Sequence, residues 1–322
     1  MTLQEITTTR ANHLIDPVLN VWHGEVALYL FLGGVVAGLM VITGLRVLRD
    51  PEAPPSRAFA LLPWAGPILL SIGMFFLWLD LEHPFNAYRF YLAFRVTSPM
   101  SWGAWILVAI YPTSMLLGWI TTPAELRAAV LKRLPLSRTI EDIGSWALAH
   151  GRVIALLNVV FGIGLGIYTG MLLGTLAARP LWNSAVLGPL FLTSGLSTGA
   201  AFMLLYRLTD QERILLGRVD MALIVAELAL ISIWLIGLAS GGSPARSALG
   251  LFFGGPYTAA FWTMVIALGL VGPLIGEALE QRHGAVPGRM AAILVLVGGF
   301  ALRWIIVYAG QYAGWVSDLA AR

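Results

Sequence analysis

The sequence contains no cysteine. Its 322 residues therefore form no disulfide bond and provide no thiolate for a zinc site or an iron–sulfur cluster. Charged residues are also scarce, at 11% of the chain against about 25% in ordinary soluble domains, and Lys132 is the only lysine. A soluble fold is excluded, because so few charges cannot cover the surface of a folded domain in water.

Hydrophobic residues make up 58% of the chain and lie in long runs without charge. A membrane-spanning helix needs about 20 mostly apolar residues, because the hydrocarbon core of a bilayer is roughly 30 Å thick. Helices are expected because lipid cannot satisfy free backbone groups, and the alternating pattern of barrel strands is absent. The predicted helices lie near residues 24–46, 59–79, 101–120, 149–176, 186–207, 217–240, 256–278 and 288–311.

These patterns predict an all-α, polytopic membrane protein with eight transmembrane helices arranged as two four-helix bundles. The chain is predicted to be a single integral membrane domain over residues 1–322. Its longest polar connection, 123–144, predicts a cytoplasmic loop that joins two halves, 1–122 and 145–322. An amphipathic stretch in this loop, 124–134, is typical of a helix that lies along the membrane interface.

Basic residues are distributed unevenly between the two sides of the predicted bundle. The loops after the odd-numbered helices hold twelve basic residues, and the opposite side, with both chain ends, holds six. Cytoplasmic loops of membrane proteins carry an excess of Lys and Arg. We therefore expect the odd-numbered loops to face the cytoplasm and both termini to lie outside. The arginine excess thus indicates topology and does not indicate a nucleic acid partner.

Polar residues gather at the predicted outer ends of several helices. The first helix begins with His23, Glu25 and Tyr29, and the last two share one helix face because they are four residues apart. Ionisable residues within a membrane are costly, and by default they mark a binding site or a pathway. Other helices bring further polar residues toward the same level: His83, Tyr168, Arg303 and Tyr308.

This group of side chains suits a quinone, whose carbonyls need hydrogen-bond donors and whose ring needs aromatic contact. A second interpretation assigns the aromatic residues to the interfacial belt, and His23 and His83 to hydrated helix ends. Haem is disfavoured, because of the five histidines only His23 and His83 are placed to meet. No metal site is predicted from these residues.

A second set of ionisable residues lies toward the predicted inner side. Asp220 lies at the start of the sixth helix, Glu227 lies two turns deeper, and Glu277 ends the seventh. Asp220 and Glu277 are equally well explained as solvated helix ends. Glu227 is remote from other charges, so we expect it to act in a proton relay or an ion pair, with Arg303 or Arg152 as partner.

Several segments resemble those of the NrfD/PsrC family of membrane proteins, and the resemblance spans almost the whole chain. It is carried by Trp22-His23-Gly24-Glu25, Leu28-Tyr29-Leu30-Phe31-Leu32-Gly33-Gly34, Leu79-Asp80-Leu81-Glu82-His83-Pro84, Thr97-Ser98-Pro99-Met100-Ser101-Trp102-Gly103, Tyr168-Thr169-Gly170-Met171, Ala178-Arg179-Pro180-Leu181-Trp182-Asn183, Ser194-Gly195-Leu196-Ser197-Thr198-Gly199, Gly254-Gly255-Pro256-Tyr257 and Val307-Tyr308-Ala309-Gly310-Gln311.

The resemblance implies a subunit of a respiratory complex in the bacterial cytoplasmic (inner) membrane. Such a subunit exchanges electrons between quinone, either menaquinone or ubiquinone, and a four-cluster ferredoxin-like iron–sulfur subunit. That partner is joined to a molybdopterin catalytic subunit or a multihaem cytochrome. The membrane subunit itself carries neither haem nor an iron–sulfur cluster, and any quinol or quinone oxidoreductase activity belongs to the assembled complex.

The resemblance also implies which residues bind quinone. In the family, polar residues of the first helix and a tyrosine of the fourth bind it near the outer face, and these positions match Glu25, Tyr29 and Tyr168. Glu25 stands where the family pattern leads us to expect a neutral amide. We expect Glu25, Tyr168 and Glu227 to carry the coupled proton transfer.

Two other functions are compatible with the sequence. A secondary transporter also has many spanning helices, Gly and Pro interruptions and buried acids, and it would carry substrate flux alone. A purely structural membrane anchor would leave Glu25, Tyr29 and Tyr168 replaceable without loss of quinol oxidation. Copurification with an iron–sulfur subunit is the observation that would favour quinone exchange.

Overall fold

The computed structural model describes residues 22–50, 56–92, 94–132, 137–176, 178–282 and 288–313. Within these ranges the regular structure is entirely helical, and eight helices are long and apolar enough to cross a membrane. The protein is therefore a multi-pass membrane protein, as predicted. The spanning helices are α1 (Gly24–Arg49), α2 (Arg57–Leu79), α4 (Pro99–Thr121), α7 (Gly151–Gly174), α8 (Leu187–Leu204), α9 (Asp210–Ser240), the continuous run Thr258–Arg282, and α13 (Arg289–Tyr312).

Shorter helices occupy the connections. They are η1 (Pro84–Asn86), α3 (Arg89–Leu92), α5 (Ala124–Leu131), α6 (Ser137–Ala149) and α10 (Ser243–Gly250). The run Thr258–Arg282 is itself composed of α11 (Thr258–Ala260), the π-helical stretch η2 (Phe261–Val271) and α12 (Gly272–Arg282). Helix α6 was not expected, because its charged, amphipathic sequence carries no membrane-spanning signal.

The start of α9 differs most from its expected position. The helix begins at Asp210, seven residues before the predicted start at 217. Thr209 and Glu212 form a capping box, in which the Thr209 hydroxyl accepts a hydrogen bond from the Glu212 N–H at 3.3 Å and the Glu212 carboxylate accepts one from the Thr209 N–H at 3.0 Å. The charged residues at the start of α9 therefore lie outside the apolar stretch but still within the helix.

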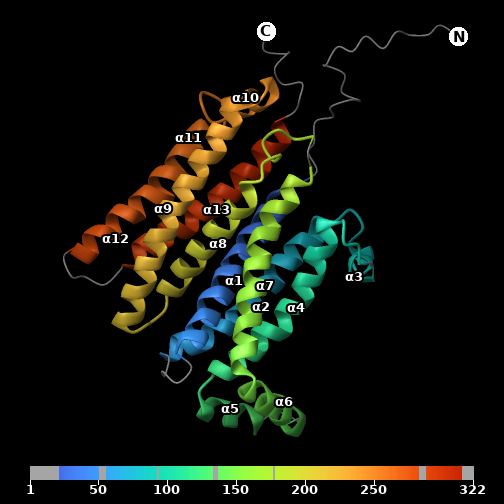
Figure 1. Ribbon diagram of the computed structural model, residues 1–322, viewed down its shortest axis with the longest axis vertical. Coiled ribbons are helices and arrows are strands. Elements are labelled where there is room, and N and C mark those ends of the chain that lie inside the picture. Colours follow the sequence, from blue (N-terminus) through green and yellow to red (C-terminus); the bar gives the residue numbers. More distant parts are fainter. Residues whose placement is uncertain are drawn as a thin grey trace, which may run out of the picture.

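Helix α1 lies at the centre of the bundle, where it packs against α2, α7, α8 and α13 (Figure 1). Glycines allow its close approach to α8. A Cβ atom added to Gly38 would lie 2.8 Å from the Gly199 Cα, so only glycine fits at this crossing.

Helix α7 follows the 123–144 connection in sequence, yet it packs against α1 and α4, which precede that connection. Helices α9, α12 and α13, with η2, pack around one another beside α8. This packing does not confirm the division into two four-helix bundles or into halves at 123–144. Both stay predictions.

The two ends of the bundle differ in their connections (Figure 1). Helix α10 and the segment between α2 and α4 lie toward the end where α1 begins, and α5 and α6 lie at the opposite end. We call the first the outer end and the second the inner end, following the predicted orientation. Which end faces the cytoplasm stays a prediction, and both chain termini lie outside the described residues.

Candidate functional site

A cavity of about 610 Å³ lies near the outer end, between α1, α2, α4 and α7 and beside α3. Its walls are mostly apolar and aromatic. The residues that line it include Trp22, Val26, Tyr29, Ser71, Met74, Phe75, Trp78, Asp80, Glu82, Phe90, Tyr91, Met100, Ala104, Leu107, Tyr111, Tyr168 and Leu172. A space of this size and lining suits a small organic ligand.

Four tyrosines contribute phenol groups to the cavity: Tyr29, Tyr91, Tyr111 and Tyr168. Tyr29 and Tyr168 are almost fully buried, and their phenols interact electrostatically with each other. Tyr111 shares a hydrogen bond of 3.1 Å with the hydroxyl of Ser71. Sequence reasoning predicted Tyr29 and Tyr168 but missed Tyr91, which lies in the short helix α3, and Tyr111, which lies in the middle of the uncharged helix α4.

Gly103 makes room for Tyr168. A Cβ atom at this position of α4 would overlap the phenol ring of Tyr168 on α7. Gly103 therefore contributes to the cavity because it has no side chain that would displace Tyr168. Tyr91 lies outside the spanning helices, and burial raises the pKa of its phenol, with a smaller contribution from Tyr111. Tyr91 consequently stays protonated near neutral pH and can donate a hydrogen bond.

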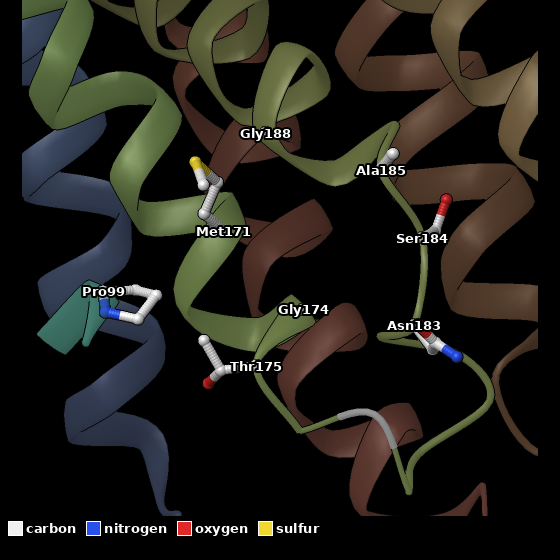
Figure 2. Close-up of a pocket in the computed structure, with 8 residues that line it drawn as sticks. All are labelled: Pro99, Met171, Gly174, Thr175, Asn183, Ser184, Ala185 and Gly188. Atoms are coloured by element: carbon white, nitrogen blue, oxygen red, sulfur yellow. The ribbon is translucent and has the colours of Figure 1, made fainter. Parts of the chain in front are cut away.

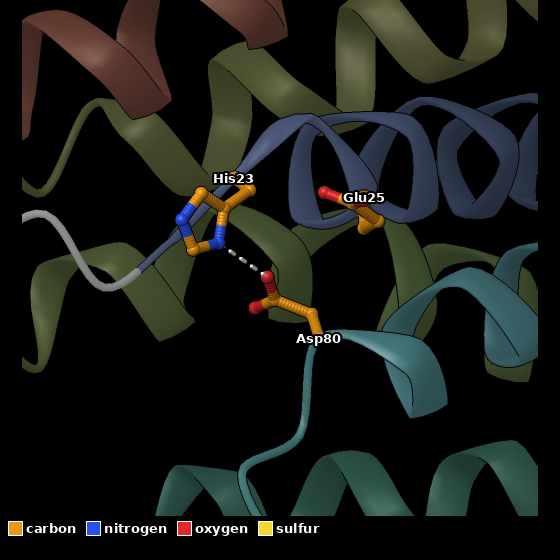
Figure 3. Close-up of side chains that lie close together, drawn as sticks. All are labelled: His23, Glu25 and Asp80. Carbon is orange, nitrogen blue, oxygen red and sulfur yellow. Dashed lines mark hydrogen bonds and ion pairs between the residues drawn. The ribbon is translucent and has the colours of Figure 1, made fainter.

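His23, Glu25 and Asp80 lie close together (Figure 3) where Trp22 and Asp80 line the cavity, a place that we call the mouth. His23 Nδ1 lies 3.0 Å from Asp80 Oδ1, across 57 residues of sequence. The His23 side chain is 59% exposed, whereas that of Asp80 is 8% exposed and also lines the cavity. This pair can pass a proton between the cavity and water. The sequence did not indicate that Asp80 pairs with His23.

Two further predicted outer residues, Tyr308 and His83, lie apart from the cavity walls. Tyr308 stacks on Trp304 with ring centroids 4.8 Å apart, and its phenol interacts electrostatically with Glu25 and Asp80. His83 is exposed and is not among the lining residues. The structure therefore brings Tyr308 close to the mouth and leaves His83 outside it.

The start of α1 is held by the end of α13. The Gln311 side chain accepts a hydrogen bond from the Trp22 N–H at 3.0 Å and donates one to the Trp22 carbonyl at 2.8 Å. Arg179 donates to the Gln311 carbonyl at 3.2 Å. The Trp22 ring packs on Trp182, whose Nε1 donates to the Ile306 carbonyl at 2.8 Å. These contacts position Trp22, a wall of the cavity, and His23 beside it.

Arg303 is fully buried away from the cavity, against α8. Its Nη1 donates to the Ser194 hydroxyl at 3.0 Å and to the Gly299 carbonyl at 2.8 Å. The guanidinium also lies over the ring of Phe191, at 5.4 Å from its centroid. Sequence reasoning placed Arg303 with the outer residues, and the structure separates it from them.

Arg303 is one member of a set of buried ionisable residues, which we call the acid string: Glu277, Asp220, Glu227 and Arg303. Glu227 interacts electrostatically with Arg303, and Asp220 interacts with Glu227 and Glu277. The Ser197 hydroxyl donates a hydrogen bond of 2.6 Å to Asp220 Oδ1. Among the described residues, Asp220 Oδ2 and both Glu277 oxygens have no hydrogen-bond partner. Such atoms are costly to bury, so they point to a function.

A second, smaller hollow of about 270 Å³ lies between the start of α4 and the connection from α7 to α8 (Figure 2). Pro99, Thr175 and Asn183 are among its lining residues. It shares no lining residue with the cluster of tyrosines, and none of its described lining residues is ionisable.

Comparison with known proteins decides the family. The family profile described as "Polysulphide reductase, NrfD" matches residues 13–313. The chain belongs to the NrfD family. The predicted resemblance is thereby confirmed over almost the whole sequence, and it agrees with the multi-pass membrane fold.

Individual NrfD relatives match along most of their length. Protein NrfD of Escherichia coli (strain K12) is 31% identical over 319 residues, which cover 95% of this chain and 99% of the relative. The polysulfide reductase C subunit of Wolinella succinogenes is 30% identical over 90% of this chain and 94% of the relative. The NrfD homolog of Haemophilus influenzae is 27% identical over 306 residues. Membership of the NrfD family is consistent with a membrane subunit of a multisubunit respiratory complex.

Proposed function

We propose that this protein is the quinone-exchanging membrane subunit of a respiratory oxidoreductase complex, and that the 610 Å³ cavity binds menaquinone or ubiquinone. The observation that carries the proposal is the convergence of four tyrosines in an apolar cavity whose mouth holds a His–Asp pair. Aromatic and aliphatic walls suit a quinone ring and the start of its tail. Phenol groups suit its carbonyls, which accept hydrogen bonds.

Each polar group has a part in this proposal. Tyr29 and Tyr168 donate hydrogen bonds from α1 and α7, and Tyr91 donates from the outer segment. Quinol, as the substrate, supplies two electrons and two protons. The His23–Asp80 pair accepts the two protons one after the other at the mouth and releases them to water, because His23 is exposed while Asp80 faces the cavity. The two electrons pass to the iron–sulfur partner. Glu25 adds a second carboxylate beside this pair.

The acid string offers a route for protons from the inner end. Glu277, Asp220 and Glu227 come from α12 and α9, and each interacts electrostatically with the next. Unpartnered carboxylate oxygens in such a series can take up and pass a proton without first breaking a hydrogen bond. We propose that Glu227 carries protons between the inner end and the region of Arg303, as part of coupled proton transfer.

The proposed partner is a four-cluster ferredoxin-like iron–sulfur subunit, joined to a molybdopterin catalytic subunit or a multihaem cytochrome. This chain has no cysteine to hold a cluster, so the electrons must leave it for another subunit. The outer segment between α2 and α4 is the proposed docking surface, because it lies outside the spanning helices and exposes Phe85, Leu92 and Phe94. The assembly would sit in the bacterial cytoplasmic membrane with both termini of this chain outside.

Replacing Tyr168 by Phe tests the proposal, because it removes one phenol oxygen and keeps the ring that fills the space beside Gly103. In the assembled complex we expect quinol oxidation to fall at least about tenfold, the effect of losing roughly 1.4 kcal/mol of hydrogen bonding. Tyr206→Phe, a matched change at the inner end of α8, should keep the wild-type rate. A wild-type rate for Tyr168→Phe would contradict the proposal and favour a purely structural anchor.

The transporter alternative has a separate test. Proteoliposomes that contain only this chain should show no substrate-dependent flux, and the chain should copurify with an iron–sulfur subunit from membranes. Flux by the isolated chain, with no such partner, would favour a transporter.

A further inference from the structure

The geometry points to a divalent transition-metal site formed by His23, Glu25 and Asp80, through which Zn²⁺ inhibits the protein (Figure 3). The inhibitory part of this inference rests on the proposed function. The binding part rests on the three side chains alone.

The three residues come from two separate helix ends. His23 immediately precedes α1, Glu25 lies in its first turn, and Asp80 immediately follows α2. One ligand atom from each residue lies within 4.8 Å of the other two. Ligands at about 2.1 Å from one ion lie at most about 4.2 Å apart. The His23–Asp80 pair, at 3.0 Å, already meets this limit, so a small movement that brings Glu25 and this pair together completes the set. An imidazole nitrogen with two carboxylate oxygens suits Zn²⁺, Co²⁺ and Mn²⁺.

The charge at this place favours a cation. Glu25 and Asp80 bring two carboxylates together, and the phenol of Tyr308 interacts with both. Among the described residues, no Lys or Arg forms an ion pair with either carboxylate, and the only ion pair here is that of Asp80 with His23. Within the described residues, the two carboxylates therefore have no Lys or Arg partner to balance their negative charges. A bound divalent cation would balance them.

The exposure of the site indicates an exchangeable ion. His23 is 59% exposed, so an ion reaches it directly from water, and three protein ligands leave coordination positions for water molecules. The fold does not need the ion, because the Trp22–Gln311 hydrogen bonds already hold the start of α1. These features are typical of a regulatory or inhibitory site.

An ion at this site would alter the wall of the cavity. It would occupy the His23 nitrogen and the Asp80 carboxylate and replace the 3.0 Å contact between them. Asp80 also lines the cavity, so the ion would place a positive charge at the cavity wall.

Titration of the purified full chain with Co²⁺, followed by visible absorption, tests the binding. We expect saturable binding of one Co²⁺ that Zn²⁺ displaces. His23→Ala, Glu25→Gln and Asp80→Asn should each weaken it at least about tenfold. Glu82→Gln and His83→Ala, which change the same outer segment outside the triad, should bind as wild type does. Absence of saturable binding, or equal binding by all five variants that gel filtration shows to be folded, would overturn the inference.

Zn²⁺ inhibition of quinol oxidation by the assembled complex tests the regulatory part. The Zn²⁺ concentration for half-inhibition should rise at least about tenfold in Glu25→Gln, measured against that variant's own rate without Zn²⁺. Equal sensitivity of wild type and variant would overturn it. The two proposals fail separately: Co²⁺ binding without quinol oxidation contradicts the proposed function, and quinol oxidation without Co²⁺ binding contradicts the metal site.

Discussion

The outer cavity and the acid string place polar groups in opposite surroundings. In the cavity, the phenols of Tyr29 and Tyr168 border an open space. In the acid string, Arg303 is packed so closely that a Cβ on Gly34 would lie 2.6 Å from its Nη2. The first arrangement can accept a ligand, whereas the second can pair charges or pass a proton. The comparison shows that buried polar residues of one membrane protein fall into two groups: those that border a cavity and those that are enclosed by close packing.

Helix α1 belongs to both regions. Tyr29 borders the cavity, and Gly34, five residues later, receives the guanidinium of Arg303. Five residues correspond to about 7.5 Å along a helix. The two regions are therefore neighbours along α1, less than two helical turns apart.

The largest expected effect comes from breaking the acid string. Arg303→Met should destabilise the chain by about 3–5 kcal/mol, because it leaves Glu227 buried with no positive partner. Thermal unfolding of the purified protein measures this loss. The double variant Arg303→Met with Glu227→Gln should recover much of it. A single variant as stable as wild type would show that the two residues are not coupled.

A smaller effect is expected from closing space in the cavity. Gly103→Ala should displace the Tyr168 ring and lower quinol oxidation at least about tenfold, with a loss of stability of about 1–3 kcal/mol. The KM for quinol and the melting temperature should be measured together. Gly237→Ala, where nothing lies within 4 Å of the new Cβ, is the control. Wild-type kinetics in Gly103→Ala would show that the position of the Tyr168 ring does not matter for quinol oxidation.

The smallest effect on stability is expected from Asp220→Asn. The change keeps the shape of the side chain and its bond with Ser197, so stability should change by less than about 1 kcal/mol. Proton uptake from the inner end should nevertheless slow, as a pH-sensitive dye inside proteoliposomes of the complex would report. Glu141→Gln, on exposed α6 at the same end, should leave proton uptake as in wild type. Equal proton uptake by Asp220→Asn and Glu141→Gln would show that Asp220 has a structural role and does not pass protons.

The helices could be predicted from the sequence more completely than the site. Long apolar runs with few or no charges indicated every spanning helix, because crossing a bilayer depends mainly on apolar length. The same criterion missed the start of α9 and all of α6, since charged residues continue a helix beyond the membrane. For the site, Tyr29 and Tyr168 were predicted, and both line the cavity.

Arg303 illustrates why the rest of the site could not be predicted. It lies five residues before Tyr308 on α13, and hydropathy assigned both to the outer group. Five residues turn a helix by about 500°, so the two side chains leave α13 in different directions. Tyr308 approaches the mouth, and Arg303 enters the packing of α8.

The sequence by itself therefore determined that the chain crosses the membrane, how many times, and which family it resembles, because these depend on local composition and short segments. Only the tertiary structure decided which polar residues meet. His23 finds Asp80 because α1 and α2 pack side by side with their outer ends level. The rotation of each helix about its axis determines which side chains meet. In this chain, the glycine-rich packing around α1 determines that rotation.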